Sequence, residues 1–236
     1  MNKIIDVIIP AYNEESAIAK VVNDIPKSLV REIIVCNNAS TDATGQIATQ
    51  AGATVVDEPR PGYGQACLAG MDHIAAKPIK PDIVVFIDGD YSDYPQEMTL
   101  LVQPLIDETA DLVIGSRALG VSESGAMMPQ QVFGNWLATR LIKLFYGHTY
   151  TDLGPFRGIT YHALKSINME DTNYGWTVEM QVKAVQHKLR IVDIPVNYKV
   201  RIGTSKVSGT LKGTIMAGYK ILWTIGKYTF VNSKRK

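Results

Sequence analysis

The sequence predicts an α/β protein with a Rossmann-like, mostly parallel central sheet covered by helices on both faces. Short runs of Ile, Val and Phe alternate with amphipathic segments in the first half of the 236-residue chain. Such runs are typical of strands buried on both faces of a parallel sheet. The run 83–87 continues directly into Asp88, Gly89 and Asp90. This places two acids at the carboxyl end of a strand, where open α/β sheets bind ligands.

Composition and charge are those of a globular protein. Hydrophobic residues make up 46% of the chain, charged residues 20%, and the net charge is +1. This balance offers no electrostatic basis for nucleic-acid binding. The two cysteines, Cys36 and Cys67, lack the spacing of a metal or redox motif. With no signal peptide and no apolar run long enough to span a membrane, we expect a cytoplasmic protein.

The first half of the chain should form five strands with helices between them. The apolar runs that predict strands are 4–10, 32–36, 54–57, 83–87 and 111–115. The segments that predict helices are 14–28, 40–51, 65–76 and 95–107. Asn13 can cap the first helix, Gly52 suits the end of the second, and Pro95 suits a first helical turn. Repeated strand–helix alternation predicts a parallel sheet.

The second half is less regular. Residues 119–128 are expected to form a loop, and 130–145 a helix whose apolar side comprises Val132, Trp136, Leu137, Leu141 and Leu144. The remaining expected elements are strands at 156–161 and 190–198, a helix at 177–187 between them, a basic loop at 199–209 and a last helix at 211–231. Because neither a repeat nor a linker is visible, a single domain spanning residues 1–236 is expected.

Four motifs follow predicted strands in a fixed order. They are Pro10-Ala11-Tyr12-Asn13-Glu14, the stretch from Asn37 to Thr44, Asp88-Gly89-Asp90, and Gly115-Ser116-Arg117. This order resembles the family 2 glycosyltransferases of GT-A fold. Within that family the chain is most similar to dolichyl- and polyprenyl-phosphate mannosyl- and glucosyltransferases. The segments 152–157 and 201–206 support that subgroup, so the resemblance covers residues 4 to 208.

The resemblance implies metal-dependent, inverting transfer of a sugar from a UDP- or GDP-linked donor to a polyprenyl phosphate. Asp88 and Asp90 would hold Mg²⁺ or Mn²⁺ on the diphosphate, since hard cations prefer oxygen ligands. Asp93 is either a further ligand through water or a solvated turn residue. The implied nucleotide-sugar site comprises Pro10, Ala11, Tyr12, Glu14, Asn37, Asn38, Asp42, Gly64, Asp88 and Gly89. By the same resemblance, 1–117 is the nucleotide-sugar half and 118–208 shapes the acceptor site. The residue pattern of 209–236 predicts a C-terminal amphipathic helix.

One departure from the family concerns the base. Asn37 and Asn38 stand where the family usually has two aspartates, one of which accepts a hydrogen bond from the nucleotide base. An amide both accepts and donates, so the base preference stays open. Asp42 would either take over part of this role or cap the following helix.

The acceptor determines the mechanism. A prenyl phosphate is already anionic and requires cations, which arginine supplies bidentately. The expected phosphate ligands are Arg157, Arg201, Ser205 and Lys206, with Arg117 nearby. A hydroxyl acceptor requires a general base, for which Asp152 and Glu179 are candidates. Glu179 is equally explained as a favourable acid at a helix start. The expected catalytic set is therefore Asp90, Arg117, Asp152 and Glu179.

The C-terminal segment concerns the membrane. Aromatic residues flanked by lysines suit an interfacial helix lying on anionic lipid, which would make the protein peripheral on the cytoplasmic face. The alternatives are packing on the domain or on a second copy, so a homo-oligomer stays open. Three functions remain: transfer to a polyprenyl phosphate, transfer to a saccharide or small hydroxyl acceptor, and nucleotide binding without transfer.

Overall fold

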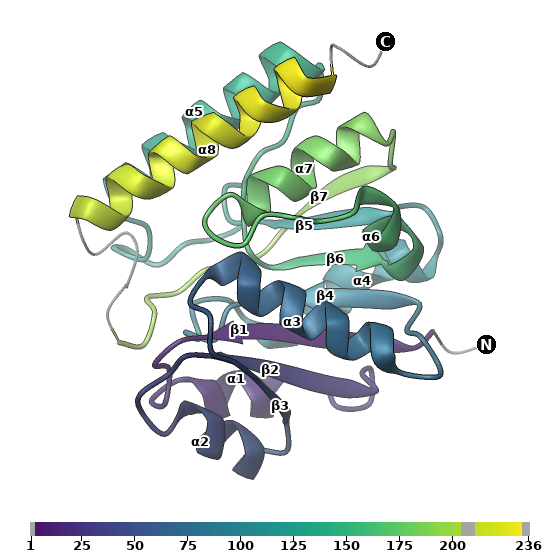
Figure 1. Ribbon diagram of the computed structural model, residues 1–236, viewed down its shortest axis with the longest axis vertical. Coiled ribbons are helices and arrows are strands. Elements are labelled where there is room, and N and C mark those ends of the chain that lie inside the picture. Colours follow the sequence, from purple (N-terminus) through teal and green to yellow (C-terminus); the bar gives the residue numbers. More distant parts are fainter. Residues whose placement is uncertain (1–2, 204–210, 233–236) are drawn as a thin grey trace.

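The central sheet has seven strands in the order β3-β2-β1-β4-β6-β5-β7 (Figure 1). The computed structural model describes residues 3–203 and 211–232, so Ser205 and Lys206 lie outside the described residues. The strands are β1 (Ile5–Ala11), β2 (Glu32–Asn38), β3 (Thr54–Glu58), β4 (Ile83–Phe86), β5 (Leu112–Ser116), β6 (Arg157–Thr160) and β7 (Ile191–Pro195). All are parallel except β6, which pairs antiparallel with both β4 and β5. The predicted fold class is confirmed.

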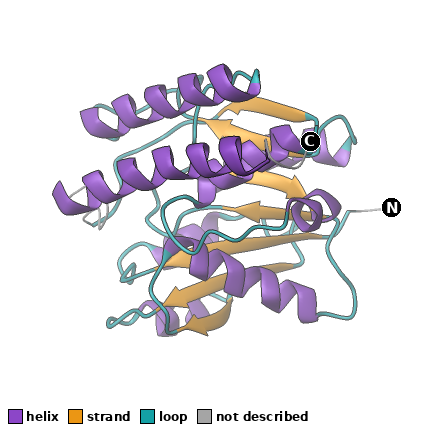
Figure 2. Ribbon diagram, turned by 45° about the horizontal axis from the view of Figure 1, so that its top comes forward, coloured by secondary structure: helices purple, strands orange, loops and turns teal. Residues whose placement is uncertain are grey.

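Helices cover both faces of the sheet, as Figures 1 and 2 show. One face carries α1 (Ile18–Asp24), α2 (Thr44–Gln50) and α4 (Met98–Ile106), the last preceded by the 3₁₀ turn η1 (Pro95–Glu97). The other face carries α3 (Tyr63–Ala76), α6 (Tyr161–Ile167) and α7 (Trp176–Gln186). The long helices α5 (Pro129–Tyr146) and α8 (Leu211–Asn232) run alongside each other above α7 (Figure 1).

Each face of the sheet builds its own apolar core. Strand residues alternate between the two cores: Ile8 packs under α3, whereas Val7 and Ile9 pack toward α1. Because β1 is buried along its whole length, its sequence is continuously apolar apart from Asp6, which pairs with Arg31. Burial on both faces keeps the carboxyl ends of the central strands in fixed positions.

The first expected helix, 14–28, is shorter than predicted. Asn13 has a positive φ of 52° and does not cap α1. Its Oδ1 instead accepts a hydrogen bond of 2.8 Å from the backbone N–H of Thr41. The loops that follow β1 and β2 are thereby tied together, which delays the start of the helix.

Two features of the second half were not predicted. The sequence indicated a strand near residues 156–161 but neither its position between β4 and β5 nor its antiparallel direction. Helix α6 was also missed, although Thr160 caps it by accepting a 3.3 Å hydrogen bond from the N–H of Ala163. The chain therefore returns into the middle of the sheet.

Helix α5 presents much of its apolar side to solvent. The side predicted from periodicity includes Val132, Trp136 and Leu144, which are 51%, 52% and 74% exposed. Contact with the core is made instead by smaller residues, chiefly Ala138 and Ile142. Within residues 3–203 and 211–232, no helix has both the length and the apolar character needed to cross a bilayer.

Candidate active site

Three carboxylates lie within the seven residues that follow β4. Asp88 is half-buried, and its Oδ1 accepts a hydrogen bond of 2.9 Å from the Tyr63 hydroxyl. Asp90 is 4% exposed, and its Oδ1 accepts from the backbone N–H of Ser92 at 2.9 Å. Asp93 is 1% exposed, and neither of its oxygens has a hydrogen-bond partner. The solvated-turn alternative for Asp93 is therefore wrong.

The electrostatics of these acids favour a cation. Burial, reinforced by the neighbouring charge of Asp90, raises the pKa of Asp88 to about 7. Burial, followed by Asp88 and Asp90, also raises the pKa of Asp93 well above its ordinary value. A buried carboxylate without a partner is costly, and an added positive charge would offset that cost. The residues present thus fit a divalent cation.

The kind of cation follows from the donor atoms. Across the described ranges, no cluster of three or more His, Cys, Asp or Glu side chains is preassembled for a metal. Two aspartates would leave the other coordination positions of the cation to phosphate oxygens and water. This ligand set is typical of Mg²⁺ and Mn²⁺ and differs from that of structural Zn²⁺.

The unpartnered carboxylate of Asp93 leads to a stability prediction. We expect Asp93→Asn to raise the free energy of unfolding of the metal-free protein by about 1–3 kcal/mol at pH 8. Because the pKa of Asp93 is raised in the folded state, the native state binds more protons at this group, and the contribution of Asp93 to wild-type stability falls as pH rises above about 4. The gain should therefore shrink toward pH 4. Urea unfolding at the two pH values measures it, with the exposed Asp107→Asn as control; a variant less stable than wild type at pH 8 would contradict it.

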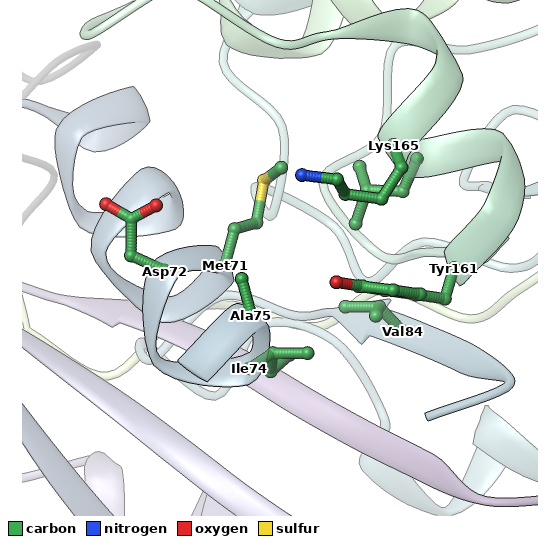
Figure 3. Close-up of a pocket in the computed structure, with 8 residues that line it drawn as sticks. Met71, Asp72, Ile74, Ala75, Val84, Tyr161 and Lys165 are labelled. Atoms are coloured by element: carbon green, nitrogen blue, oxygen red, sulfur yellow. The ribbon is translucent and has the colours of Figure 1, made fainter. Parts of the chain in front are cut away.

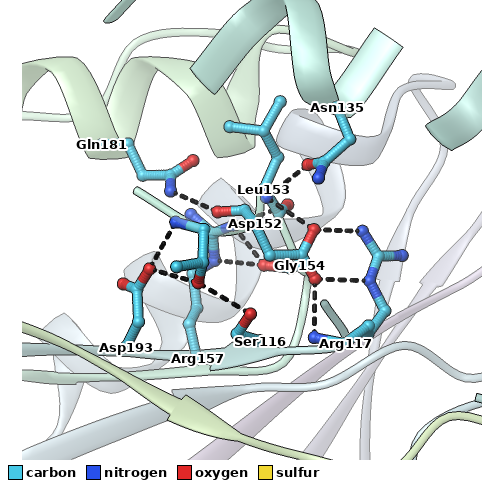
Figure 4. A network of polar contacts seen from close by, with 10 residues as sticks. Ser116, Arg117, Asn135, Asp152, Leu153, Gly154, Arg157, Gln181 and Asp193 are labelled. Atoms are coloured by element: carbon cyan, nitrogen blue, oxygen red, sulfur yellow. Dashed lines mark hydrogen bonds and ion pairs between the residues drawn. The ribbon is translucent and has the colours of Figure 1, made fainter. Parts of the chain in front are cut away.

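Arg117 and Asp152 form a buried bidentate ion pair at the end of β5 (Figure 4). The Arg117 Nε and Nη2 atoms donate to the two carboxylate oxygens at 2.7 and 2.8 Å, and the Arg117 N–H donates at 2.8 Å. Burial alone would lower the pKa of Arg117, but Asp152 raises it above its ordinary value. The guanidinium also lies 5.0 Å from the ring centre of Tyr198. Asp152 is thus an anchor for Arg117, which disfavours it as a general base.

The backbone on both sides of Asp152 is held by several elements, as Figure 4 shows. Asn135 of α5 accepts from the N–H of Leu153 at 2.7 Å, and Gln181 of α7 donates to the Asp152 carbonyl at 2.8 Å. Asp193 of β7 accepts from the N–H of Thr151 at 2.6 Å. These contacts fix the backbone that presents Asp152 to Arg117.

Arg157 and Glu179 lie inside the protein. Arg157 is 0% exposed and donates to the carbonyls of Leu153, Gly154 and Thr177. Glu179 is also 0% exposed; it accepts from the N–H of Asp171 at 2.7 Å and pairs with Lys183 at 2.8 Å. Their expected roles in phosphate binding and base catalysis have no support in this arrangement. Both side chains stabilise the fold around α7.

The two asparagines after β2 differ in their surroundings. The side-chain amide of Asn38 bonds only to backbone groups among the contacts described. Its Nδ2 donates to the carbonyls of Glu58 and Arg60, and its Oδ1 accepts from the N–H of Gly62. Asn37 donates to Asp57 at 2.8 Å, while its Oδ1 is buried without a partner. Asn37 therefore has an unpaired acceptor oxygen, whereas Asn38 holds the loop that leads into α3.

The other residues expected at the nucleotide site flank the loops after β1 and β2. Pro10 and Ala11 end β1 beside Gly89, and Tyr12 is 45% exposed. Glu14 is 8% exposed, and its N–H donates to Thr44 at 2.8 Å. Asp42 accepts from the N–H of Thr44 at 3.0 Å and from that of Glu15 at 3.2 Å. Asp42 therefore orders the start of α2 and joins the two loops.

Gly64 allows a close approach, but of protein backbone. A Cβ at this position would lie 2.0 Å from the carbonyl oxygen of Asp171. The next residue, Gln65, donates its N–H to the Thr172 carbonyl at 2.9 Å. The glycine is thus needed to seat the start of α3 against the loop before α7.

A small cavity lies away from these residues, between α3 and α6 (Figure 3). Its volume is about 40 Å³, close to that of a single water molecule. Met71, Ile74, Tyr161 and Lys165 contribute to its lining. It is near the amino-terminal half of β4, opposite the carboxylates, and too small for a nucleotide.

The order and geometry of the site match a known family. The model of "Glycosyl transferase family 2" matches residues 6–168, which is more than half of the chain. The chain belongs to this family. An uncharacterized glycosyltransferase of Mycobacterium tuberculosis (strain ATCC 25618 / H37Rv) is 37% identical over 217 residues, covering 90% of this chain and 94% of that protein. A dolichyl-phosphate hexose transferase of Haloferax volcanii is 30% identical over 205 residues and covers 85% of each chain.

Solved structures agree. Glucosyl-3-phosphoglycerate synthase from Mycobacterium tuberculosis, in complex with Mn²⁺, UDP-glucose and phosphoglyceric acid, superposes with a TM-score of 0.73. The sequences are 26% identical, and the match covers 95% of this chain and 80% of that one. The family 2 glycosyltransferase described here therefore has the GT-A fold, and the predicted resemblance is confirmed.

Three residues at the site were not anticipated. Tyr63 donates to Asp88, Ser92 donates its hydroxyl and its N–H to Asp90, and Tyr198 covers Arg117. Ser92 follows Asp90 by two residues, a spacing at which an aspartate commonly bonds a backbone N–H, so a local signal existed. Tyr63 and Tyr198 are distant in sequence and could be found only from the fold.

Proposed function

We propose that this glycosyltransferase transfers a hexose, with inversion, from a nucleotide diphosphate sugar to a polyprenyl phosphate, using Mg²⁺ or Mn²⁺. The observation that carries the proposal is that carboxylates and arginine side chains lie close together at the end of β4. Asp88 and Asp90 suit a metal–diphosphate, and Arg117 and Arg201 lie close enough to act on Asp88 electrostatically. The dolichyl-phosphate hexose transferase relative supports the lipid-phosphate acceptor.

Each group in the proposed site has a defined role. Asp88 and Asp90 would hold the cation, which when bound supplies Lewis-acid stabilisation of the leaving diphosphate. Asn37 would accept a hydrogen bond from the base through its free Oδ1. Arg117, fixed by Asp152, would orient an anionic group of the donor or acceptor. An acceptor phosphate is itself the nucleophile, so the ion-paired state of Asp152 is compatible with this reaction.

A second candidate is transfer to the hydroxyl of a small phosphorylated acid. The similarity to glucosyl-3-phosphoglycerate synthase bound to phosphoglyceric acid favours it. Such an acceptor needs a general base. Because Glu179 is enclosed and Asp152 is paired with Arg117, this candidate requires a base other than these two residues in the arrangement seen here.

A donor and acceptor panel distinguishes the candidates. Purified protein with Mn²⁺ would be given UDP- and GDP-sugars, each with either a short-chain prenyl phosphate or 3-phosphoglycerate. We expect labelled hexose to appear in the prenyl-phosphate product. Product only with phosphoglycerate would favour the second candidate. Nucleotide binding by calorimetry without transfer to either acceptor would contradict both and favour a nucleotide-binding protein without transferase activity.

The outer helices support an acceptor that resides in a membrane. Trp136 and Phe133 of α5 are 52% and 61% exposed, and Tyr219 and Trp223 of α8 are 60% and 56% exposed. The rings pair within each helix, with centroids 5.9 and 6.4 Å apart. Exposed basic side chains accompany them: Arg140, Lys143 and Lys227. Aromatic and cationic side chains together suit the interface of an anionic bilayer.

This surface leads to a prediction on lipid binding. We expect the double variant Trp136→Ser/Trp223→Ser to bind vesicles of phosphatidylglycerol and phosphatidylcholine at least about tenfold more weakly than wild type, because each buried aromatic contributes about 1.5–3 kcal/mol. Co-sedimentation measures the partitioning. Leu100→Ser is the matched control, since Leu100 is 58% exposed on α4. Unchanged vesicle binding, or a wild type that forms stable dimers through this surface, would contradict the membrane assignment.

A further inference from the structure

A short segment crosses the carboxyl end of β4 and lies directly against the loop that carries Asp90 and Asp93. This segment, residues 196–203, is called the strap below. Backbone hydrogen bonds hold it: Lys199 donates to the Ser92 carbonyl at 2.9 Å, and Ile202 donates to the Asp90 carbonyl at 3.0 Å. Tyr198 forms bridges with Asp93 and with Ser122. The strap is therefore anchored to the loop that carries Asp90 and Asp93.

The side chain of Arg201 forms an ion pair with the Oδ2 oxygen of Asp90. Its Nη2 lies 2.7 Å from Asp90 Oδ2 and 3.5 Å from Glu14 Oε1. The other oxygen of Asp90 is already taken by Ser92. The only oxygen of Asp90 that Ser92 does not use is Oδ2, and the guanidinium of Arg201 is paired with that oxygen. Arg201 is the counter-charge that permits a nearly buried Asp90 to stay beside Asp88.

The pairing of Arg201 is incomplete. Its Nε is buried without a hydrogen-bond partner, and its side chain is 27% exposed. A buried donor without a partner weakens the bound state relative to a fully paired guanidinium. The partial exposure gives the side chain a route to solvent. Both features favour a contact that can be exchanged.

We propose that Arg201 is a resident counter-cation that a divalent metal displaces from Asp90, so that metal binding releases the strap. The inference rests on the proposed metal-dependent function. A divalent cation and a guanidinium repel each other, and they compete for the same oxygen. Once displaced, Arg201 becomes available to an anionic acceptor, so donor binding would precede acceptor binding. Arg201 is accordingly a positioning residue that couples the two halves of the site.

The first test measures Mn²⁺ affinity on the full-length protein in the presence of UDP. If Arg201 holds Asp90 at least nine-tenths of the time, Arg201→Gln should bind Mn²⁺ at least about tenfold more tightly, because the competent fraction limits apparent affinity. The Mn²⁺ affinity of Arg201→Lys, which keeps the charge but loses the bidentate guanidinium, should lie between those of wild type and Arg201→Gln. Arg190→Gln is the matched control, since Arg190 pairs with Asp111 at the amino-terminal end of β5. Titration calorimetry reports all four proteins.

The second test separates displacement from a purely electrostatic effect. Hydrogen exchange of peptides covering the strap should accelerate in wild type when Mn²⁺ is added, and should already be fast in metal-free Arg201→Gln. Unchanged strap protection at saturating Mn²⁺, or Mn²⁺ affinity of Arg201→Gln within twofold of wild type, overturns the inference alone. Failure of both proteins to bind Mn²⁺ overturns the proposed metal-dependent function along with it.

Discussion

Replacing Asp90 by asparagine is expected to reduce the transfer rate by at least about a thousandfold, equivalent to about 4 kcal/mol of transition-state stabilisation. The Oδ2 atom of Asp90, paired with Arg201 in the metal-free protein, is the oxygen that would hold the cation, and asparagine removes the charge without changing the shape. The Oδ1 contact with Ser92 survives the substitution, so the fold should be retained. Steady-state transfer at saturating Mn²⁺ measures the effect.

Two controls make the Asp90 prediction specific. Asp107→Asn removes an exposed carboxylate at the end of α4 and should leave the rate unchanged. Calorimetry should show that Asp90→Asn also weakens Mn²⁺ binding in the presence of UDP. A variant that binds and transfers like wild type would exclude Asp90 as a metal ligand.

Removing Arg117 should have the largest effect on stability. In Arg117→Met the carboxylate of Asp152 would be buried without a counter-charge, which costs about 3–5 kcal/mol. For a chain of this size the corresponding fall in Tm is about 6–20 °C. Thermal unfolding followed by circular dichroism measures it. Activity should fall as well, because the same guanidinium faces the candidate site.

A double-variant cycle separates the lost pair from other effects. Arg117→Met/Asp152→Asn removes both charges, and we expect it to regain most of the lost stability while remaining inactive. If the double variant is as unstable as Arg117→Met, the destabilisation arises from packing against Tyr198 rather than from the unpaired carboxylate.

The sheet could be predicted because its information is local. Runs such as 83–87 are apolar without interruption, and in the structure β4 is buried throughout. The direction of β6 could not be predicted, because a four-residue strand carries no local signal for its neighbours. The side of α5 that packs against the core could not be predicted either. Of the predicted apolar side, Leu141 packs against the core, whereas Val132, Trp136 and Leu144 face solvent, so periodicity alone did not identify the buried side.

The site divides in the same way. Asp88 and Asp90 were located by their place after a strand, which the chain itself specifies. Arg157 and Glu179 also stand in segments that suggested a functional site. Tertiary packing encloses both side chains, and the burial of a charged residue cannot be predicted from its neighbours in sequence. The contact of Arg201 with Asp90 joins residues more than a hundred positions apart and likewise emerges only on folding.

The antiparallel strand β6 has a consequence for how this enzyme can be divided. Although β5 lies within the first 117 residues, its partners in the sheet are β6 and β7, which come from the second half. A fragment ending after Arg117 would leave β4 with an unpaired edge and β5 without a neighbour. We therefore expect that the donor half cannot be produced as a separate module or exchanged between relatives at that boundary. A functional chimera would have to exchange β5, β6 and β7 together.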